Sequence, residues 1–259
     1  MRIKQSACYP MMKPEGMGLE EFFRTARAIG YAAVELWGRG DDFDDVVKLA
    51  RKHKLAIAVM SGHKSLTDGL NVRANHDRIE GELKESIDLA ARHAIPGLIC
   101  LAGSRQPGLG DDEAVDIVAE GLRRVAAYAE KKRVNLNLEL LNSKIDHPGY
   151  QGDHTAWGVA VCRRAASRRV KLLYDVYHMQ IMEGDIIRTI TDNIDFIGHF
   201  HTAGVPGRHE FDDAQELNYR GICRAIAATS YSLYVGHEFE AKGSLVEAMR
   251  LAFETCDVE

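Results

Sequence analysis

The 259-residue sequence lacks the short motifs that mark several common classes of binding protein. No GxGxxG follows the first apolar segment and no GxxxxGKS/T occurs anywhere, so dinucleotide-binding and P-loop folds have no support. The five cysteines form no CxxC pair and are odd in number, which is typical of reduced, buried thiols in a cytoplasmic protein.

Long apolar runs and an excess of positive charge are also missing. No segment approaches the ~18 apolar residues of a membrane span, and Lys4, Pro10 and Lys13 interrupt the start of the chain. We therefore expect neither a membrane anchor nor a signal peptide. The formal net charge is -5, whereas binding to nucleic acid needs concentrated positive charge. These absences favour a cytoplasmic protein and argue against nucleic acid as its main partner.

What the sequence does contain is short apolar segments that alternate with longer amphipathic ones. Hydrophobic patterning predicts strands at 3–9, 32–37, 55–61, 97–103, 134–140, 170–175, 195–202 and 232–240. It predicts helices at 20–30, 44–53, 76–93, 111–132, 157–168, 184–194, 216–229 and 244–255. Alternation of this kind predicts parallel strands joined by helical crossovers. An open sheet is the alternative, but eight repeats favour one (β/α)8 TIM barrel, a single α/β domain over residues 1–259.

Polar residues recur where the predicted strands end, which is the face that carries function in such barrels. The long, polar loops also leave the third, fifth and seventh strands at this face. Four residues stand out there: Glu139, Asp175, His201 and Glu238. Three crowded carboxylates would repel one another, and a divalent cation would remove that penalty. Oxygen ligands with one imidazole suit Mn²⁺, Mg²⁺ or Co²⁺ better than Zn²⁺.

Two of these positions have alternative interpretations. Asp175 is a candidate helix N-cap, but the next helix is predicted to begin near Glu183, so we do not expect a cap there. Glu240 shares a strand face with Glu238 and is the alternative ligand on the eighth strand.

Several further polar and aromatic residues are expected in supporting roles. We expect His63 to line the mouth of the barrel and Trp37 to form an apolar wall there. His199 is predicted to be a hydrogen-bonded core residue. Glu35 either belongs to the polar set at the strand ends or pairs with a neighbouring Arg or Lys. The remaining expectation is that three histidines lie in solvated loops: His76, His147 and His154.

The stretches YDVYHMQIMEGD, IGHFHTAGVPGRHE, ELNY and YVGHEF resemble the hydroxypyruvate isomerase family of xylose-isomerase-like TIM barrels. The resemblance implies one divalent metal held by residues at four strand ends: Glu139, Asp175, His201 and Glu238. It implies further that Glu139 and Glu238 are the acid/base pair, and that His178 and Arg208 contact substrate oxygens. It also implies a homo-oligomer, either a dimer or a tetramer.

One departure from the family pattern bears on the substrate. His201 stands where hydroxypyruvate isomerases usually carry Gln, which leans toward the ketose 3-epimerases of the same superfamily. We expect a metal-dependent isomerase that acts through an enediolate on a small α-hydroxy carbonyl compound, of the hydroxypyruvate/tartronate semialdehyde type or an aldose/ketose. The alternatives are a ketose 3-epimerase, an endonuclease IV-like nuclease and a non-catalytic metal-binding subunit.

Overall fold

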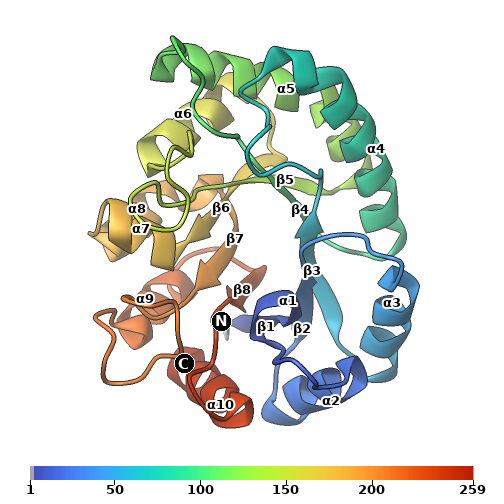
Figure 1. Cartoon of the computed structure of the whole chain (residues 1–259), viewed down its shortest axis with the longest axis vertical. Coiled ribbons are helices and arrows are strands. Elements are labelled where there is room, and N and C mark those ends of the chain that lie inside the picture. The colour runs from blue at the N-terminus through green and yellow to red at the C-terminus, as the bar shows by residue number, and fades with distance from the viewer. Residues whose placement is uncertain (1–2, 259) are drawn as a thin grey trace.

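The computed structural model describes residues 3–258, within which the strands close into one barrel (Figure 1). Neighbouring strands are parallel and follow chain order, and the last strand pairs with the first. The strands are β1 (Lys4–Cys8), β2 (Ala33–Leu36), β3 (Ala56–Ser61), β4 (Gly97–Cys100), β5 (Asn135–Glu139), β6 (Val170–Asp175), β7 (Ile197–Thr202) and β8 (Tyr234–His237). Each lies inside a predicted segment, and the predicted TIM barrel is confirmed.

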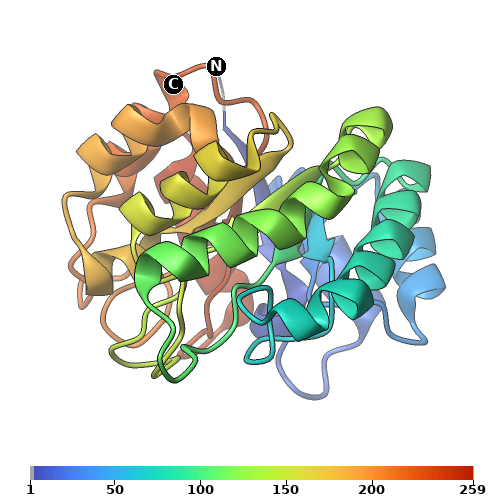
Figure 2. The ribbon, with the colours of Figure 1, turned by 90° about the horizontal axis from the view of Figure 1, so that it is seen from above.

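Helices cover the outer face of the strands, as the turned view of Figure 2 also shows. They are α2 (Leu19–Ile29), α3 (Phe43–Lys52), α4 (His76–Arg92), α5 (Asp111–Lys132), α6 (Thr155–Ala165), α8 (Ile186–Asn193), α9 (Tyr219–Ala227) and α10 (Leu245–Cys256), with 3-10 turns η1 (Arg73–Asn75) and η2 (Ile194–Phe196). Helix α2 ends before Gly30, whose φ of 126° is open to glycine and unfavourable for other residues. Within 3–258 no helix is long and apolar enough to cross a membrane.

Two short helices were not predicted, and both begin directly after a strand. Helix α1 (Tyr9–Met12) follows β1, and α7 (Val176–Met182) follows β6. Each is shorter than the window over which helical periodicity can be recognised, which explains why the pattern missed them. Both lie at the carboxyl ends of the strands, so they contribute to the functional face.

The two faces of each strand pack differently. On β5, Leu136 and Leu138 join the main apolar core between strands and helices, whereas Asn137 and Glu139 alternate with them and face the barrel interior. A small separate apolar cluster of the described residues comprises Val59, Ile99 and Leu173. Most hydrophobic stabilisation therefore comes from the outer core, and part of the interior is left to polar residues.

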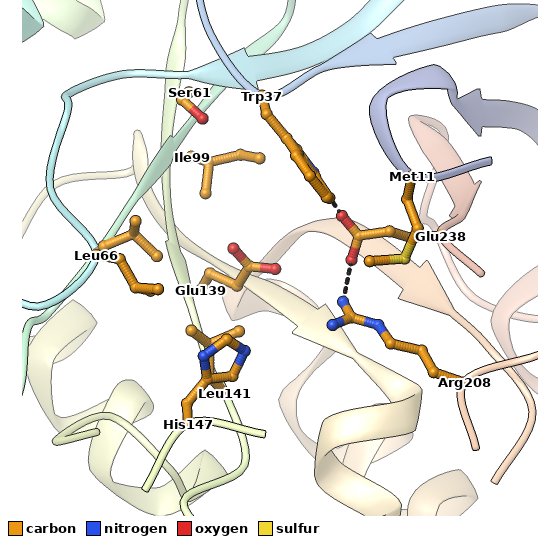
Figure 3. A pocket seen from close by; sticks show the side chains of 11 residues that line it. Met11, Trp37, Ser61, Leu66, Ile99, Glu139, Leu141, His147, Arg208 and Glu238 are labelled. Carbon is orange, nitrogen blue, oxygen red and sulfur yellow. Dashed lines mark hydrogen bonds and ion pairs between the residues drawn. The ribbon is translucent and has the colours of Figure 1, made fainter. Parts of the chain in front are cut away.

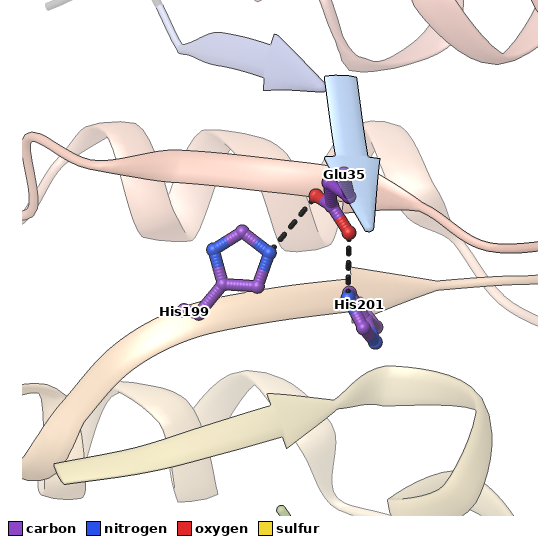
Figure 4. A group of neighbouring side chains, drawn as sticks. All are labelled: Glu35, His199 and His201. Carbon is purple, nitrogen blue, oxygen red and sulfur yellow. Dashed lines mark hydrogen bonds and ion pairs between the residues drawn. The ribbon is translucent and has the colours of Figure 1, made fainter. Parts of the chain in front are cut away.

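Glu35, on β2, is 1% exposed and joins three strands across the barrel interior. One carboxylate oxygen lies 2.5 Å from Ser6 Oγ. The carboxylate also lies 2.9 Å from His199 Nε2 and 2.8 Å from His201 Nε2, as Figure 4 shows. Burial acts to raise the pKa of Glu35, but His199 and His201 outweigh it and lower that pKa to about 2. The prediction that His199 is a hydrogen-bonded core residue is confirmed. The alternative in which Glu35 pairs with an Arg or Lys is wrong, because two imidazoles and a hydroxyl surround it.

The expectation of solvated histidines holds for His154 and fails for His76. His154 is about half exposed, at the N-cap position of α6. His76 is 2% exposed, and its Nε2 lies 2.8 Å from the carbonyl oxygen of Leu70. The loop after β3 folds back over the start of α4, so a histidine in a polar stretch becomes buried.

Gly236, on β8, leaves the space that Glu35 occupies, and this generates a stability prediction. A Cβ at this position would lie 2.0 Å from Glu35 Oε1, an atom that Ser6 and His199 hold in place, while His201 holds the other carboxylate oxygen. We expect Gly236→Ala to lower the free energy of unfolding by about 1–3 kcal/mol, the usual cost of overpacking, as measured by urea denaturation.

The matched control is Gly81→Ala in α4, where an added Cβ meets nothing within 4 Å. Because alanine favours a helix over glycine, this variant should be neutral or up to about 1 kcal/mol more stable. Equal stability of the two variants would contradict the close packing of Gly236 against Glu35.

Candidate active site

Four of the predicted site residues converge where the strands end. Glu139 ends β5, Asp175 ends β6, His201 lies on β7 and Glu238 directly follows β8. All four are buried, and each offers a ligand atom within 4.8 Å of the ligand atoms of the others. Opposite ligands of Mg²⁺ are about 4 Å apart, because each lies about 2.1 Å from the ion. The group is therefore close to the size that a divalent cation needs.

His201 has one ring nitrogen committed to Glu35 and the other aimed at this group. Its Nε2 lies 2.8 Å from Glu35 Oε2, so a proton on Nε2 is held by the carboxylate. Its Nδ1 lies 3.4 Å from Glu139 Oε1 and 3.3 Å from Glu238 Oε2. Among the described residues this buried atom has no hydrogen-bond partner. A buried ring nitrogen directed at two carboxylates, while the other ring nitrogen is held by an outer carboxylate, is the arrangement expected of a metal ligand once its proton is displaced.

Asp175 serves as the N-cap of α7, which corrects the expectation that it caps no helix. Its Oδ1 accepts hydrogen bonds from Tyr177 N at 2.8 Å and His178 N at 3.4 Å. The helix begins at Val176, immediately after the strand, rather than near Glu183. Because the cap uses Oδ1, Oδ2 stays free to face the group. The cap and the ligand interpretations are therefore compatible.

Arg208, from the loop after β7, reaches into the same group. Its Nη2 lies 2.5 Å from Glu238 Oε2 and 3.8 Å from Asp175 Oδ2. Trp37 Nε1 donates a hydrogen bond of 2.7 Å to the other oxygen of Glu238, so Trp37 is more than the apolar wall predicted for it. When His201 is neutral, three carboxylates face one guanidinium, and this excess of negative charge favours a bound cation.

Burial and charge shift the pKa values of the group in opposite directions. Burial raises the pKa of Asp175 to about 7, although Arg208 and His201 oppose the shift. Burial also acts to raise the pKa of Glu238, but His201 and Arg208 outweigh it and hold that pKa well below its usual range. For His201, burial acts to lower the pKa, and Glu238 and Glu35 raise it well above its ordinary value. Protons and Arg208 thus balance these carboxylates, and a divalent cation would displace protons on binding.

His178 is fully buried beside Asp175. Its Nε2 lies 3.5 Å from Asp175 Oδ2, and its Nδ1 lies 2.6 Å from Nδ2 of Asn142. Burial, reinforced by Arg208, lowers the pKa of His178 well below its ordinary value. The ring is therefore neutral, and its Nε2 is directed toward Asp175 of the four-residue group.

A cavity of about 250 Å³ opens onto the group (Figure 3). Glu139, Glu238 and Arg208 form its polar side, and Figure 3 shows the two carboxylates pointing toward each other across it. The other lining residues are mostly apolar: Met11, Trp37, Ser61, Leu66, Ile99, Leu101, Leu141 and His147. The prediction that His147 is a solvated loop residue holds in part, because it lies in a loop but is half-buried, with its ring centroid 5.4 Å from that of His178.

Two other sequence candidates lie away from the cavity. His63 is 5% exposed and does not line the cavity, and its Nε2 accepts a hydrogen bond of 2.9 Å from Leu101 N. Burial lowers the pKa of His63 to about 4. Glu240 is exposed, and its backbone groups bond to Arg208 and His209. Glu238 rather than Glu240 therefore joins the four-residue group.

Sequence reasoning missed two contacts that support the site. Glu35 binds His201, which lies 166 positions later in the chain, and no local pattern reports such a pair. Asn142 is fully buried and contacts His178, although it lies in a polar loop that reads as solvent-exposed. A buried asparagine in such a loop gives no sequence signal.

Comparisons with known proteins agree with the barrel fold. The model of the xylose isomerase-like TIM barrel family matches residues 23–255. The chain is 26% identical over 260 residues to a putative hydroxypyruvate isomerase of Homo sapiens, covering 95% of this chain and 93% of that protein. It is 29% identical over 175 residues to the hydroxypyruvate isomerase of Escherichia coli (strain K12), covering 66% and 67%. The crystal structure of an AP endonuclease, family 2, from Brucella melitensis superposes with a TM-score of 0.85 at 23% identity, covering 95% and 96%, which shows a shared fold.

The four-residue group generates a prediction about metal binding. After treatment with a chelator, the protein should bind one equivalent of Mn²⁺ or Co²⁺ per chain in isothermal titration calorimetry. Changes outside a ligand set typically weaken metal affinity by about 10–100-fold. Glu238→Gln removes the charge of a proposed ligand, so it should weaken the affinity by more than this.

Glu240→Gln is the matched control, because Glu240 is exposed and lies two residues from Glu238. Its metal affinity should equal that of the unmodified chain. A similar loss of affinity in both variants would show that the four-residue group is not the binding site.

Proposed function

Since the chain is an isomerase that belongs to the xylose isomerase-like TIM barrel family, we propose that it interconverts a small α-hydroxy carbonyl compound of the hydroxypyruvate/tartronate semialdehyde type. The observation that carries the proposal is the cavity of about 250 Å³ whose polar side is formed by Glu139, Glu238 and Arg208 beside a four-residue ligand group. The reaction moves one proton between neighbouring carbons and needs neither an oxidant nor a nucleotide.

The residues that would hold one divalent cation are Glu139, Asp175, His201 and Glu238. The unpartnered Nδ1 of His201 among buried carboxylates fits such an ion, with Mn²⁺ or Mg²⁺ favoured and Co²⁺ or Zn²⁺ possible by ligand type. The cation supplies Lewis acidity, which lowers the pKa of the carbon-bound proton and stabilises negative charge on substrate oxygens.

Glu139 and Glu238 are proposed as the acid/base pair. One carboxylate removes the proton from the carbon that bears the hydroxyl group, which leaves an enediolate. The other carboxylic acid returns a proton to the former carbonyl carbon, and the hydroxyl proton passes to the former carbonyl oxygen, so that carbonyl and hydroxyl exchange places. Arg208, which lines the cavity, binds a substrate oxygen or carboxylate, and His178 donates a hydrogen bond to an oxygen.

The apolar side of the cavity supports a short substrate. Leu66, Ile99 and Leu101 offer no hydrogen-bonding side chains, and Met11 and Leu141 extend the same surface. A polyhydroxyl chain placed against these residues would leave hydroxyl groups without partners, at a cost of about 1–3 kcal/mol for each buried group. A three- or four-carbon keto acid has few hydroxyl groups to satisfy.

A ketose 3-epimerase is the second candidate, and His201 is the observation that favours it, since this position resembles the epimerase pattern. The same acid/base pair would then return the proton to the opposite face of the same carbon. A nuclease finds less support, because β4 is followed by Leu101 and not a histidine. His63 also uses Nε2 to accept a backbone hydrogen bond.

The acid/base assignment predicts the effect of two conservative substitutions. Glu139→Gln and Glu238→Gln should each lower kcat for hydroxypyruvate isomerisation by about 10²–10⁴-fold, because general acid–base catalysis typically contributes that factor. The rates are measured in Mn²⁺-loaded protein, with Glu240→Gln as the control that should keep full activity. Full turnover by either test variant, or by protein freed of metal, would refute the assignment.

The apolar side of the cavity predicts substrate preference. We expect kcat/KM for hydroxypyruvate to exceed that for D-fructose by about 100-fold or more. Leu66→Asn should lower this ratio of kcat/KM values, because it supplies the cavity with a side chain that can form hydrogen bonds to the hydroxyl groups of fructose. Leu66 is 41% exposed, so the change should be tolerated in folding.

The matched control is Leu251→Asn, an identical change at a residue of α10 that is 39% exposed and lies away from the cavity. It should leave the ratio unaltered. A higher kcat/KM for the ketohexose in the unmodified chain would instead support the epimerase.

A further inference from the structure

The two ring nitrogens of His178 lie in different surroundings. The ring is fully buried, with Nδ1 2.6 Å from Asn142 Nδ2. Nε2 is 3.5 Å from Asp175 Oδ2 and has no hydrogen-bond partner among the described residues. A neutral imidazole carries one N–H and one lone pair, and the partner of one nitrogen decides which nitrogen is protonated.

The orientation of the Asn142 amide follows from its other contacts. Its Oδ1 accepts from the backbone N–H of Ile145 at 3.0 Å and of Asp146 at 2.9 Å. A backbone N–H can only donate, so this atom is the amide oxygen and the atom facing His178 is the NH₂ group. The same NH₂ group donates its second hydrogen to Asp146 Oδ2 at 2.6 Å. All four hydrogen-bonding positions of the amide are occupied.

We propose that Asn142 is a positioning residue that holds His178 as the tautomer with its proton on Nε2. Because the Asn142 NH₂ donates to Nδ1, that nitrogen must supply the lone pair. The N–H at Nε2 is then directed toward Asp175 and the four-residue group.

This tautomer has two consequences for the site. A protonated Nε2 has no lone pair to bind a cation, so His178 stays outside the ligand set although it lies beside it. The same N–H can donate a hydrogen bond to a substrate oxygen held by the group. This hydrogen bond becomes stronger as negative charge develops on that oxygen. The second consequence rests on the proposed isomerase function, whereas the tautomer does not.

The test compares two variants that differ only at residue 142. Asp146→Asn is the background, so that no second carboxylate faces the new one, and Asp146→Asn/Asn142→Asp is the test variant. An aspartate at 142 can accept a hydrogen bond from Nδ1 but cannot donate one. The proton of His178 should therefore move to Nδ1, while the backbone donors of Ile145 and residue 146 keep an oxygen to bond.

The readout is ¹⁵N NMR of histidine-labelled, metal-free protein, with His178→Gln used to assign the His178 signals. The unmodified chain and Asp146→Asn should both show the proton on Nε2, and the double variant should show it on Nδ1. A proton on Nδ1 in the unmodified chain overturns the proposal. So does a proton that stays on Nε2 in the double variant.

Turnover of the Mn²⁺-loaded protein tests the second consequence. The double variant should have a kcat about 10–100-fold below that of Asp146→Asn, with an unchanged midpoint of thermal unfolding. Equal kcat values would overturn the positioning role. A failure of the proposed function has a different signature, because the unmodified chain would then turn over none of the α-hydroxy carbonyl compounds while the NMR result stayed as predicted.

Discussion

The buried carboxylate of Glu35 is the interaction on which the arrangement of the site depends. An ionised carboxylate inside a barrel costs several kcal/mol unless hydrogen bonds replace its lost water. Ser6, His199 and His201 supply those bonds. The bond to His201 also sets the direction of a ligand, because with Nε2 facing Glu35 only Nδ1 can face Glu139 and Glu238.

The Glu35 network and the small apolar cluster occupy different parts of the barrel interior, and the lining of the cavity shows a similar separation of polar and apolar residues. The apolar cluster of Val59, Ile99 and Leu173 lies on β3, β4 and β6, whereas the Glu35 network joins β1, β2 and β7. At the mouth, Ile99 belongs to the apolar side of the cavity and Glu238 to its polar side. The proposed substrate would therefore meet charged groups at its reacting end and hydrocarbon at the other.

The sequence was sufficient for the barrel and for the four residues at the strand ends, because both depend on local patterns. Apolar periodicity locates strands, and a polar residue at the end of a buried run is conspicuous. It was insufficient where a role depends on a distant partner. The histidine partners of Glu35 could not be predicted, because they lie 164 and 166 positions away. The cap that Asp175 forms could not be predicted either, because the seven residues of α7 are too few to show helical periodicity.

His201 and His178 show why residue type alone does not identify a ligand. Both are buried imidazoles beside the same carboxylates, but one has a hydrogen-bond acceptor behind it and the other has a hydrogen-bond donor. Glu35 can only accept a hydrogen bond from His201, so Nε2 carries a proton and Nδ1 is the nitrogen that faces the group. Asn142 donates to Nδ1 of His178, so that ring presents an N–H instead. With an acceptor behind one ring and a donor behind the other, the proposed site would use His201 as a ligand for a cation and His178 as a donor to an oxygen that the cation binds.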